Sequence, residues 1–357
     1  MEVEVSRIFS IFAILFATSV AYADAPSMAV HFIDVGQGDS IFIQSPEGKT
    51  MLIDAGEKNG LAEKYLNSIG VKTIDVLVAT HPHLDHIGGL VDIVKKFEIK
   101  SVVMPRVTDV TTVTYRQLLE AVQAKGLRIT EGKAGLVIDF GPSVLTECLA
   151  PNSTDYKDVN DYSVVIKMTY GEVSFLFTGD ATTLSESEML NFQKDKLKAT
   201  VLKVPHHGST SSSSASFIKE VNPHISIFSV GNGNDYGHPT QTVLKRMENT
   251  YLFRTDTQGS VIIATQGTNL AAYSPPINGT YPALAAAQTP VPVAVAAQPS
   301  PAVASQYPQA ASTDTVYVTK SGAKYHKAGC RHLTAPIATT RQEAINNNYT
   351  PCAVCKP

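Results

Sequence analysis

The chain has 357 residues, of which 43% are hydrophobic, enough for one large domain or two unequal ones. Its formal net charge of -3 at pH 7 excludes a global basic field, so a nucleic-acid partner would need a local basic patch or a metal ion to meet its phosphates. Cys148 is the single cysteine of the large domain, and Cys330, Cys352 and Cys355 lie near the end. This uneven distribution excludes a disulfide framework spread over the fold.

The N-terminus predicts a targeting segment. Arg7 precedes an apolar run over residues 8–20, and an A-x-A cleavage motif follows at positions 21–23, so residues 1–23 are typical of a secretory signal peptide. The run is short for a membrane span, and no other segment is long and apolar enough to cross a bilayer. We therefore expect no stable membrane span after signal cleavage and a secreted or periplasmic protein; an uncleaved anchor is the alternative.

The region from 27 to 275 alternates strand-like and helix-like segments. Strands are predicted at 30–33, 41–43, 50–53, 74–79, 101–104, 163–169, 173–177, 200–204, 225–230 and 261–264, with short strands near Val137 and Val144. Helical spacing occurs at 61–69, 87–97, 115–124, 184–192, 215–220 and 242–247. Two β-rich halves with interspersed helices favour an α+β fold in which helices cover a sandwich of sheets.

The remaining chain divides into a linker and a small module. Residues 276–313 are rich in Pro, Ala, Gln and Ser, a composition that cannot bury a core and predicts an extended linker. We expect a compact module over residues 314–357.

A dense cluster of metal-ligating side chains follows the predicted strand at 74–79. Within six residues the sequence places His81, His83, Asp85 and His86 in an H-x-H-x-D-H motif. Three imidazoles and a carboxylate are costly to crowd together unless a cation lies among them. Divalent metals prefer these ligands, so the motif indicates a metal site rather than a packing cluster.

Other polar side chains also follow predicted strands. They are Asp54 after 50–53, Asp180 after 173–177, the pair His206 and His207 after 200–204, and His238 in a Y-G-H-P segment. Loops at strand ends allow a rigid sheet to hold ligands from distant parts of the chain. We interpret Asp34, Asp39 and Asp54 as structural carboxylates or as groups that brace ligand histidines.

Together these motifs resemble the metallo-β-lactamase superfamily, whose pattern is a strand followed by Asp, H-x-H-x-D-H, a later His, an Asp after a strand and a final His. The segments F-I-D-V-G-Q-G-D-S at 32–40, L-F-T-G-D at 176–180, V-P-H-H-G-S at 204–209 and Y-G-H-P at 236–239 are similar to the extracellular catalytic domain of ComEC-like competence proteins. The resemblance implies an αββα sandwich and a metal-dependent hydrolase.

By this resemblance, His81 and His83 bind one metal, Asp85 and His86 bind a second, and Asp180 bridges the two. The last ligand is one of the two histidines at 206 and 207, and we favour His206.

The sequence departs from the superfamily pattern in one respect. No histidine lies between the H-x-H-x-D-H motif and Asp180, so Asn160 or Asp161 would take the place of a ligand there. The first site is then richer in oxygen, which weakens Zn²⁺ binding or favours Mn²⁺. Occupancy by one or by two divalent metals stays open.

Two metal ions that share a water supply a metal-bound hydroxide as the nucleophile and neutralise phosphate charge. We expect Asp85 to orient that hydroxide and His238 to protonate the leaving oxygen or to hold the phosphate. Ser209, Thr210 and Asn234 are candidates for hydrogen bonds to phosphate oxygens. The alternatives are that His238 is a turn residue before a proline and that the serine-rich segment is a flexible polar loop.

The C-terminal module carries H-x3-C and C-x2-C motifs formed by His326, Cys330, Cys352 and Cys355. Their zinc-ribbon-like spacing, in a module with too little core to fold easily alone, predicts one structural zinc. The segment resembles the zinc-binding domain of the Ada methyl-phosphotriester repair protein, but His326 stands where that family has cysteine, so its methyl-acceptor chemistry is not transferred. A disulfide between the last two cysteines, and His332 in place of His326, are the alternatives.

The leading interpretation is an exported metal-dependent phosphodiesterase, a nuclease with DNA as its substrate. The catalytic-domain resemblance and the basic residues of the C-terminal module both favour this substrate. One alternative is a metallo-hydrolase of another ester, such as a phosphocholine, cyclic nucleotide or lactone. A second is a nucleic-acid-binding protein with a degenerate metal site.

Overall fold

The computed structural model describes residues 27–107 and 112–273 and the short stretches 291–293, 315–319, 324–326, 330, 337–340 and 350–352. The chain divides into two compact units, Met1–Pro299 and Ser300–Pro357, which are described separately. The predicted signal peptide and most of the predicted linker lie outside the described residues. Among the helices of the described residues, none has the length and apolar character needed to cross a membrane.

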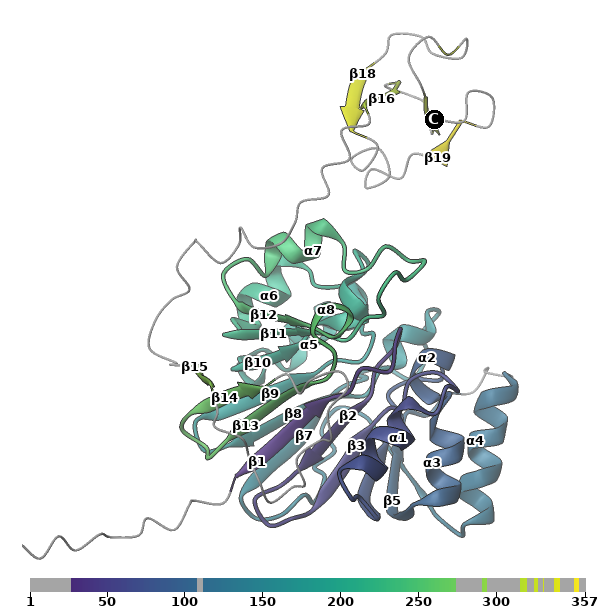
Figure 1. Ribbon diagram of the computed structural model, residues 1–357, viewed down its shortest axis with the longest axis vertical. Helices are drawn as coiled ribbons and strands as arrows, with labels where there is room; N and C mark the ends of the chain where they lie inside the picture. Colours follow the sequence, from purple (N-terminus) through teal and green to yellow (C-terminus); the bar gives the residue numbers. More distant parts are fainter. Residues whose placement is uncertain are drawn as a thin grey trace, which may run out of the picture. The chain divides into compact units, whose positions relative to one another are not determined.

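The first unit contains two β-sheets and helices on both sides of them (Figure 1). Its strands are β1 Met28–Phe32, β2 Ile41–Gln44, β3 Thr50–Ile53, β4 Thr73–Val78, β5 Glu98–Met104, β6 Ile129–Glu131, β7 Val144–Ala150, β8 Val165–Tyr170, β9 Val173–Phe177, β10 Val201–Lys203, β11 Ile225–Phe228, β12 Tyr251–Arg254, β13 Val261–Thr265, β14 Leu270–Tyr273 and β15 Val291–Val293. Its α-helices are α1 Leu61–Ser68, α2 Leu84–Ile87, α3 Leu90–Lys96, α4 Val113–Ala124, α5 Thr183–Phe192, α6 Ala215–Val221, α7 Gln241–Arg246 and α8 Thr255–Gln258, and its 3₁₀ turns are η1 Val159–Tyr162, η2 Lys194–Lys196 and η3 Pro205–Gly208.

Strand order places the ligand-bearing loops at the carboxyl ends of parallel strands. The first sheet has the order β15-β14-β13-β1-β2-β3-β4-β5-β6, and the second has the order β12-β11-β10-β9-β8-β7. Strands β3 to β6 run parallel to one another, as do β9 to β12. Because parallel neighbours end at the same edge of a sheet, the loops after β3 and β4, and those after β9, β10 and β11, gather at common edges.

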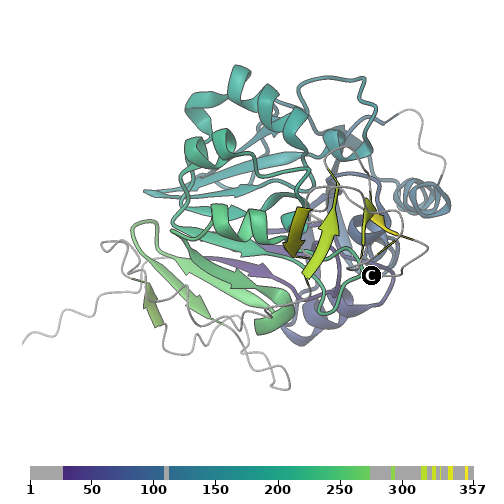
Figure 2. The same cartoon turned by 90° about the horizontal axis from the view of Figure 1, so that it is seen from above.

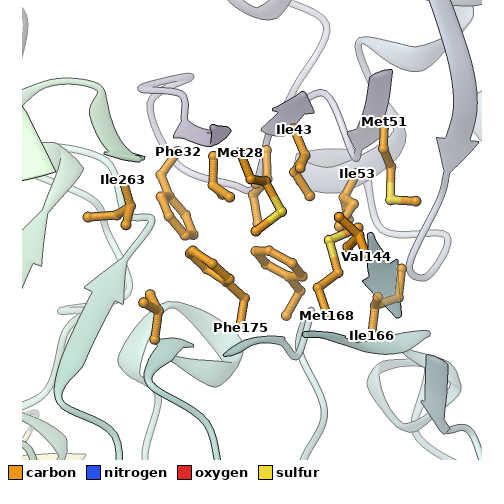
Figure 3. Close-up of a cluster of buried hydrophobic side chains, with 14 of the residues drawn as sticks. Met28, Phe32, Ile43, Met51, Ile53, Val144, Ile166, Met168, Phe175 and Ile263 are labelled. Atoms are coloured by element: carbon orange, nitrogen blue, oxygen red, sulfur yellow. The ribbon is translucent and has the colours of Figure 1, made fainter. Parts of the chain in front are cut away.

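The two sheets pack face to face around an apolar core. Figure 3 shows Phe32 and Ile43 of the first sheet facing Phe175 and Met168 of the second. All four side chains are fully buried, and burial of each one contributes about 1.5–3 kcal/mol relative to an exposed position. This core joins the two sheets and so fixes the relative positions of their loops.

Strand alternation sends other side chains to helices on the outer faces. In β4, Val76 and Val78 point into the inter-sheet core, whereas Leu77 belongs to the cluster that packs under α1, α3 and α4. In the second sheet, Leu176 and Leu202 lie in the cluster under α5, α6 and α7. Figures 1 and 2 show these two helical layers on opposite sides of the sandwich. The predicted αββα sandwich is confirmed.

Some elements differ from the sequence prediction. The helix expected at 87–97 is two helices, α2 and α3, separated at Gly88 and Gly89; a Cβ atom on Gly89 would lie 2.4 Å from the Ala55 carbonyl oxygen. The strand expected near Val137 is an isolated bridge to Glu147. The strands β6 and β12 were not predicted because they are edge strands with partly exposed side chains and no clear apolar pattern. Strand β15 lies within the predicted linker and pairs with β14.

The second unit shows four short strands in its described part. They are β16 Thr315–Val318, β17 Lys324–Tyr325, β18 Ile337–Thr340 and β19 Thr350–Pro351. Strands β16 and β18 pair antiparallel, and β17 and β19 pair parallel.

Candidate metal centre

The loop after β3 carries a buried carboxylate, Asp54, that accepts hydrogen bonds from residues of and next to the H-x-H-x-D-H motif. Asp54 accepts hydrogen bonds from the Thr80 backbone N–H at 2.8 Å and from the Thr80 hydroxyl at 2.6 Å. Because that hydroxyl donates to Asp54, its oxygen is free to accept from His81 Nδ1, which lies 3.1 Å away. The lone pair of His81 is thereby left on Nε2, which lies 3.0 Å from His83 Nδ1. These two ring nitrogens form the first side of the site.

The Asp54 carboxylate also fixes the orientation of the His86 ring, which belongs to α2. His86 Nδ1 donates to Asp54 Oδ2 over 2.8 Å, so its other nitrogen, Nε2, faces the site. Nε2 lies 3.3 Å from Asp180 Oδ1 and 3.9 Å from Asp85 Oδ2. Asp54 therefore orients donors on both sides of the site, as the bracing role predicted for it requires.

The turn after β10 brings a third histidine into this group. Both His206 and His207 adopt left-handed backbone conformations, with φ of 50° and 53°, a region that non-glycine residues visit mainly where the surroundings impose it. His207 Nδ1 donates to the Ser229 carbonyl over 2.8 Å, which leaves Nε2 as the acceptor nitrogen. That nitrogen lies 3.3 Å from both Asp85 Oδ2 and Asp180 Oδ2.

The geometry favours His207 over His206, the histidine that we preferred from the sequence. His206 is partly exposed, its Nδ1 pairs with the Ser211 hydroxyl at 2.8 Å, and its Nε2 is 3.6 Å from Asp180 Oδ2. His207 is buried, and its donor atom lies within 4.8 Å of those of Asp85, His86 and Asp180, a group that could hold a metal ion. His206 Nε2 thus approaches Asp180 alone, whereas His207 Nε2 approaches both Asp85 and Asp180.

Asp180 connects the two sides of the site. Its Oδ1 faces His86, while its Oδ2 lies 3.3 Å from His207 Nε2 and 3.9 Å from His81 Nε2. The carboxylate is buried between histidines of both sides, which is the position that a bridging ligand occupies. Asp180 thus lies within reach of histidines on both sides, and its bridging role stays a prediction.

Three buried polar atoms of this group have no hydrogen-bond partner: His86 Nε2, His207 Nε2 and Asp180 Oδ1. Buried polar atoms are nearly always paired, because an unpaired one costs about 1–3 kcal/mol. The three converge on one another, and imidazole nitrogens with carboxylate oxygens are common ligands of divalent metals. The donor set therefore fits a divalent cation.

The charges of the site lead to the same conclusion. Burial would raise the pKa of Asp180, but the neighbouring His207 and His86 hold it well below its ordinary value. Burial would lower the pKa of His86, but Asp180, Asp85 and Asp54 hold it well above. Burial and the nearby His86 lower the pKa of His81 well below its ordinary value. The buried, charged carboxylates are thus stable only if positive charge lies close to them. Protons on the histidines or a metal ion can supply that charge.

Comparison with known proteins assigns this arrangement to a family. The model of the metallo-beta-lactamase superfamily matches residues 33–231, which is more than half of the chain. The chain belongs to the metallo-beta-lactamase superfamily. It is accordingly a metal-dependent hydrolase by fold and by donor set.

Its relatives within the superfamily are ComEC-like, as the motifs indicated. The chain is 34% identical over 253 residues to ComE operon protein 3 of Bacillus subtilis (strain 168) and 29% identical over 247 residues to Competence protein ComA of Neisseria gonorrhoeae. Each match covers 65% of this chain and 32% of the relative, so the chain spans about a third of the length of the curated relatives it matches. Among solved structures, the metallo-beta-lactamase fold protein YhfI from Bacillus subtilis is 11% identical, with 64% of this chain and 96% of that chain covered and a TM-score of 0.43.

A buried ion pair braces the His207 side of the superfamily site. Lys203, at the end of β10, lies 2.5 Å from Asp39 Oδ2 and donates to the Gly179 carbonyl at 3.2 Å, next to Asp180. Asp39 Oδ1 is 3.4 Å from His207 Nδ1. Asp39 was expected to be a structural carboxylate or a bracing group. Lys203 was not among the expected residues, although a lysine at the end of a buried strand just before V-P-H-H was the available signal.

The turn that carries Asp39 packs directly on the ligand helix. Gly38 has φ +125°, and a Cβ atom there would lie 2.0 Å from the Asp85 carbonyl oxygen. Asp39 N–H donates to the same carbonyl over 3.1 Å. This close approach is the reason that the D-V-G-Q-G-D segment requires glycine at that position. Asp34 lies outside the group, since its Oδ1 accepts from Gly36 N–H within the turn.

The segment expected to take the place of the missing superfamily histidine is η1, and its two candidate residues make different contacts. Asp161 Oδ1 accepts from the hydroxyl of Thr182 at 2.6 Å and from the N–H groups of Thr182 and Ser185 at 3.3 Å each, so this carboxylate caps the start of α5. Asn160 is buried, and its Oδ1 has no hydrogen-bond partner. Of the two residues, Asn160 therefore has a buried oxygen that is not already hydrogen-bonded, and its role as the oxygen donor stays a prediction.

The residues expected to contact phosphate differ in whether their side chains are already hydrogen-bonded within the protein. Asn234 donates to the carbonyls of Gly231 and His238 and accepts from His238 N–H, so its amide closes the loop rather than facing a substrate. The Ser209 hydroxyl pairs with that of Ser211 at 3.0 Å, whereas Thr210 is exposed. Of the three, Thr210 is the most available to a ligand.

The ring of His238 packs edge-on against that of His206 beside the site. Its ring centroid lies 5.8 Å from that of His206, and its Nδ1 is buried without a hydrogen-bond partner. Burial, together with the neighbouring His207 and His206, lowers the pKa of His238 to about 4. The ring is therefore neutral at neutral pH.

The described part of the second unit brings three of its four predicted zinc ligands together. The donor atoms of His326, Cys330 and Cys352 lie within 4.8 Å of one another, and His326 Nδ1 is 3.2 Å from Cys330 Sγ. One imidazole and two thiols are the donor types of a structural zinc site. Cys355 and the alternative ligand His332 lie outside the described residues.

Proposed function

We propose that this protein is an exported metal-dependent phosphodiesterase that cleaves DNA. The observation that carries the proposal is the position of Asp180, whose two oxygens face histidines on both sides of the site. A bridging carboxylate between two groups of donors suits a pair of divalent metals. Two-metal sites are typical of nucleases and phosphatases because they bind both the attacking and the leaving oxygens of a phosphoryl group.

The residues fit distinct parts of that reaction. When bound, the divalent metals lower the pKa of a water and neutralise charge on the phosphate. Asp85 has one of its oxygens near His207 and keeps about a quarter of its side chain exposed, so it can orient the attacking water while it ligates. Burial would raise the pKa of Asp85, but the neighbouring His86 and His207 hold it well below its ordinary value, so the carboxylate stays charged.

The role proposed for His238 follows from its charge. A neutral imidazole can donate one N–H to a phosphate oxygen, whereas protonation of a leaving group requires a protonated ring. Because its pKa lies near 4, we propose that His238 holds the phosphate rather than acting as the general acid at neutral pH.

The choice of DNA rests on the relatives and on the C-terminal module. A relative with 29% identity is named a competence protein, and competence is the uptake of DNA. The basic residues of the C-terminal module suit contact with nucleic-acid phosphates. Export follows from the N-terminal segment, whose charged and apolar parts precede an A-x-A motif.

One experiment tests the proposal. The purified protein is loaded with Mn²⁺ or Zn²⁺ and incubated with single-stranded DNA, double-stranded DNA, RNA and bis-p-nitrophenyl phosphate. The proposal is supported if the rate of DNA cleavage falls at least about 100-fold in Asp85→Ala and stays unchanged in the exposed control Asp139→Asn. Loss of a metal ligand is expected to raise the activation barrier by several kcal/mol. Hydrolysis of the small diester or of a carboxylic ester without DNA cleavage would indicate another ester substrate, and DNA binding without turnover in either metal would indicate a binding protein.

A further inference from the structure

One large aromatic side chain lies exposed beside the candidate metal centre. Tyr236 is 69% exposed, and its ring stacks on that of His238, with centroids 5.8 Å apart and an interplanar angle of 21°. The His238 ring in turn contacts His206, whose Nε2 lies 3.6 Å from Asp180 Oδ2. A continuous path of rings therefore runs from the bridging carboxylate to the surface and ends in an open aromatic face.

The backbone around Tyr236 is held in place rather than loose. The Asn234 side chain makes three hydrogen bonds across the loop, to the carbonyls of Gly231 and His238 and from the N–H of His238. Gly231 N–H also donates to Gln37 Oε1, which ties this loop to the turn that packs on Asp85. The large exposed fraction of this ring, on a loop held by these hydrogen bonds, leaves an aromatic face open to a ligand.

We propose that Tyr236 is a stacking platform for a nucleobase next to the scissile phosphate, so that the enzyme selects unpaired nucleic acid. The inference rests on the proposed phosphodiesterase function and names its substrate class. A planar base can continue the stack formed by Tyr236 and His238 while its phosphate reaches the metal centre. A base inside a duplex has both faces covered by its neighbours, so only a single strand, a frayed end or a flipped base can stack in this way.

The proposal predicts a loss that depends on the base. Stacking of a base on an aromatic side chain contributes about 1–3 kcal/mol, which converts to a roughly 5- to 100-fold change in binding. Tyr236→Ala should raise KM for a single-stranded oligonucleotide by this factor. Tyr236→Phe keeps the aromatic face and should stay within about twofold of the native enzyme. The native enzyme should cleave the single strand faster than its duplex, and Tyr236→Ala should reduce that preference.

The chain offers a matched control in Phe192. This residue is also 69% exposed, but it ends α5, a ten-residue helix that starts three residues after Asp180 and is about 15 Å long. Phe192→Ala removes an equal aromatic exposure far from the site and should leave KM for the oligonucleotide unchanged. Equal losses in Phe192→Ala and Tyr236→Ala would indicate a general surface effect and would overturn the proposal.

An abasic oligonucleotide with the same backbone separates stacking from other roles. If Tyr236 stacks on a base, the ratio of kcat/KM for the intact strand to that for the abasic strand falls in Tyr236→Ala by the same roughly 5- to 100-fold. An unchanged ratio would show that the tyrosine acts on the backbone or on loop order, and would overturn the proposal. Melting temperatures of both variants establish that the fold is intact.

The failure of this inference is distinguishable from failure of the proposed function. Absence of any phosphodiester cleavage by the native enzyme contradicts the function. In that case fluorescence anisotropy with labelled intact and abasic strands still measures whether Tyr236→Ala weakens binding selectively for the strand that carries bases. Cleavage by the native enzyme with no base-dependent effect of Tyr236→Ala contradicts the inference alone.

Discussion

The two sides of the candidate metal centre differ in how their histidines are oriented. On the Asp85–His86–His207 side, each histidine has a polar partner at its Nδ1, whereas the His81–His83 side has fewer such partners. Asp54 orients His86, and the Ser229 carbonyl and Asp39 orient His207. On the other side, His81 is oriented through Thr80, and we expect the amide of Asn160, whose Oδ1 has no hydrogen-bond partner, in place of a third nitrogen donor. Second-layer hydrogen bonds commonly change metal affinity 10- to 100-fold, so the difference predicts that the first metal to bind occupies the His207 side.

The strongest test of this asymmetry is the pair of adjacent histidines. His207→Ala removes a donor from the braced side and should lower activity by at least about 100-fold and remove one equivalent of metal, because a ligand contributes several kcal/mol to metal-assisted chemistry. His206→Ala removes a partly exposed ring and should cost less than about tenfold. Activity assays and metal analysis by mass spectrometry check both variants. The reverse order of effects would restore His206 as the ligand.

A second test removes the buried ion pair while keeping charge balance. Lys203→Met combined with Asp39→Asn should lower metal affinity by about 10- to 100-fold through looser placement of His207 and Asp180. Lys203→Met alone also leaves the Asp39 carboxylate buried without its partner and should cost about 3–5 kcal/mol in stability. Calorimetric metal titration and urea unfolding separate the two effects. Full metal affinity in the double variant would show that the pair only stabilises the fold.

Metal binding should depend on pH in a direction that the site charges determine. Burial lowers the pKa of His86, but Asp180 and its neighbours hold it well above 6.5, and the carboxylates also raise the pKa of His207, so both rings carry protons in the metal-free protein near neutral pH. A metal must displace those protons. The apparent metal affinity therefore rises as pH increases above 6.5, by up to about tenfold per pH unit for each proton released. Chelator competition at pH 6.5 and 8.5 measures it, and an affinity that falls over this range would contradict the charge assignment.

The smallest expected effects are those of substitutions at Asn160 and Asp161, and they test which of the two residues binds metal on the His81–His83 side. Asp161→Ala removes the carboxylate that accepts from the Thr182 hydroxyl and the Ser185 N–H at the start of α5, and should cost about 1 kcal/mol in stability with little change in metal content. Asn160→Ala should leave stability similar but lower occupancy of the His81–His83 side, and Asn160→His should raise its affinity for Zn²⁺. Metal analysis at limiting zinc compares the three. If Asp161→Ala rather than Asn160→Ala loses metal, the assignment of the two residues is wrong.

Much of this centre was predictable because its donors follow β-strands whose apolar pattern is plain in the sequence. The strand at 73–78 and the H-x-H-x-D-H motif locate His81 to His86, and the position of Asp180 after β9 follows in the same way. The choice between His206 and His207 was not predictable, since it depends on two left-handed backbone angles that tertiary contacts impose. Lys203 was missed because a strand pattern treats a lysine as exposed, and its buried partner Asp39 lies 164 residues earlier in the chain.

Asn160 and Asp161 show a second limit of sequence reasoning. Both are buried residues of one 3₁₀ turn, and either oxygen suits a divalent metal. Only the placement of α5 shows that the Asp161 carboxylate is already engaged by Thr182 and Ser185. Which neighbour is free to ligate therefore depends on a helix that begins more than twenty residues later.

The bridging position of Asp180 also has a consequence for how the chain reaches its active form. His86, Asp180 and His207 come from segments far apart in sequence and meet only when the two sheets have closed on each other. An unfolded chain has no such site, so metal capture follows completion of folding. The bound ion then shifts the folding equilibrium, by about 2.7 kcal/mol at a free metal concentration 100 times Kd. Before it folds, the chain has no assembled hydrolytic site, and the metal supply of the compartment where it folds sets when activity begins.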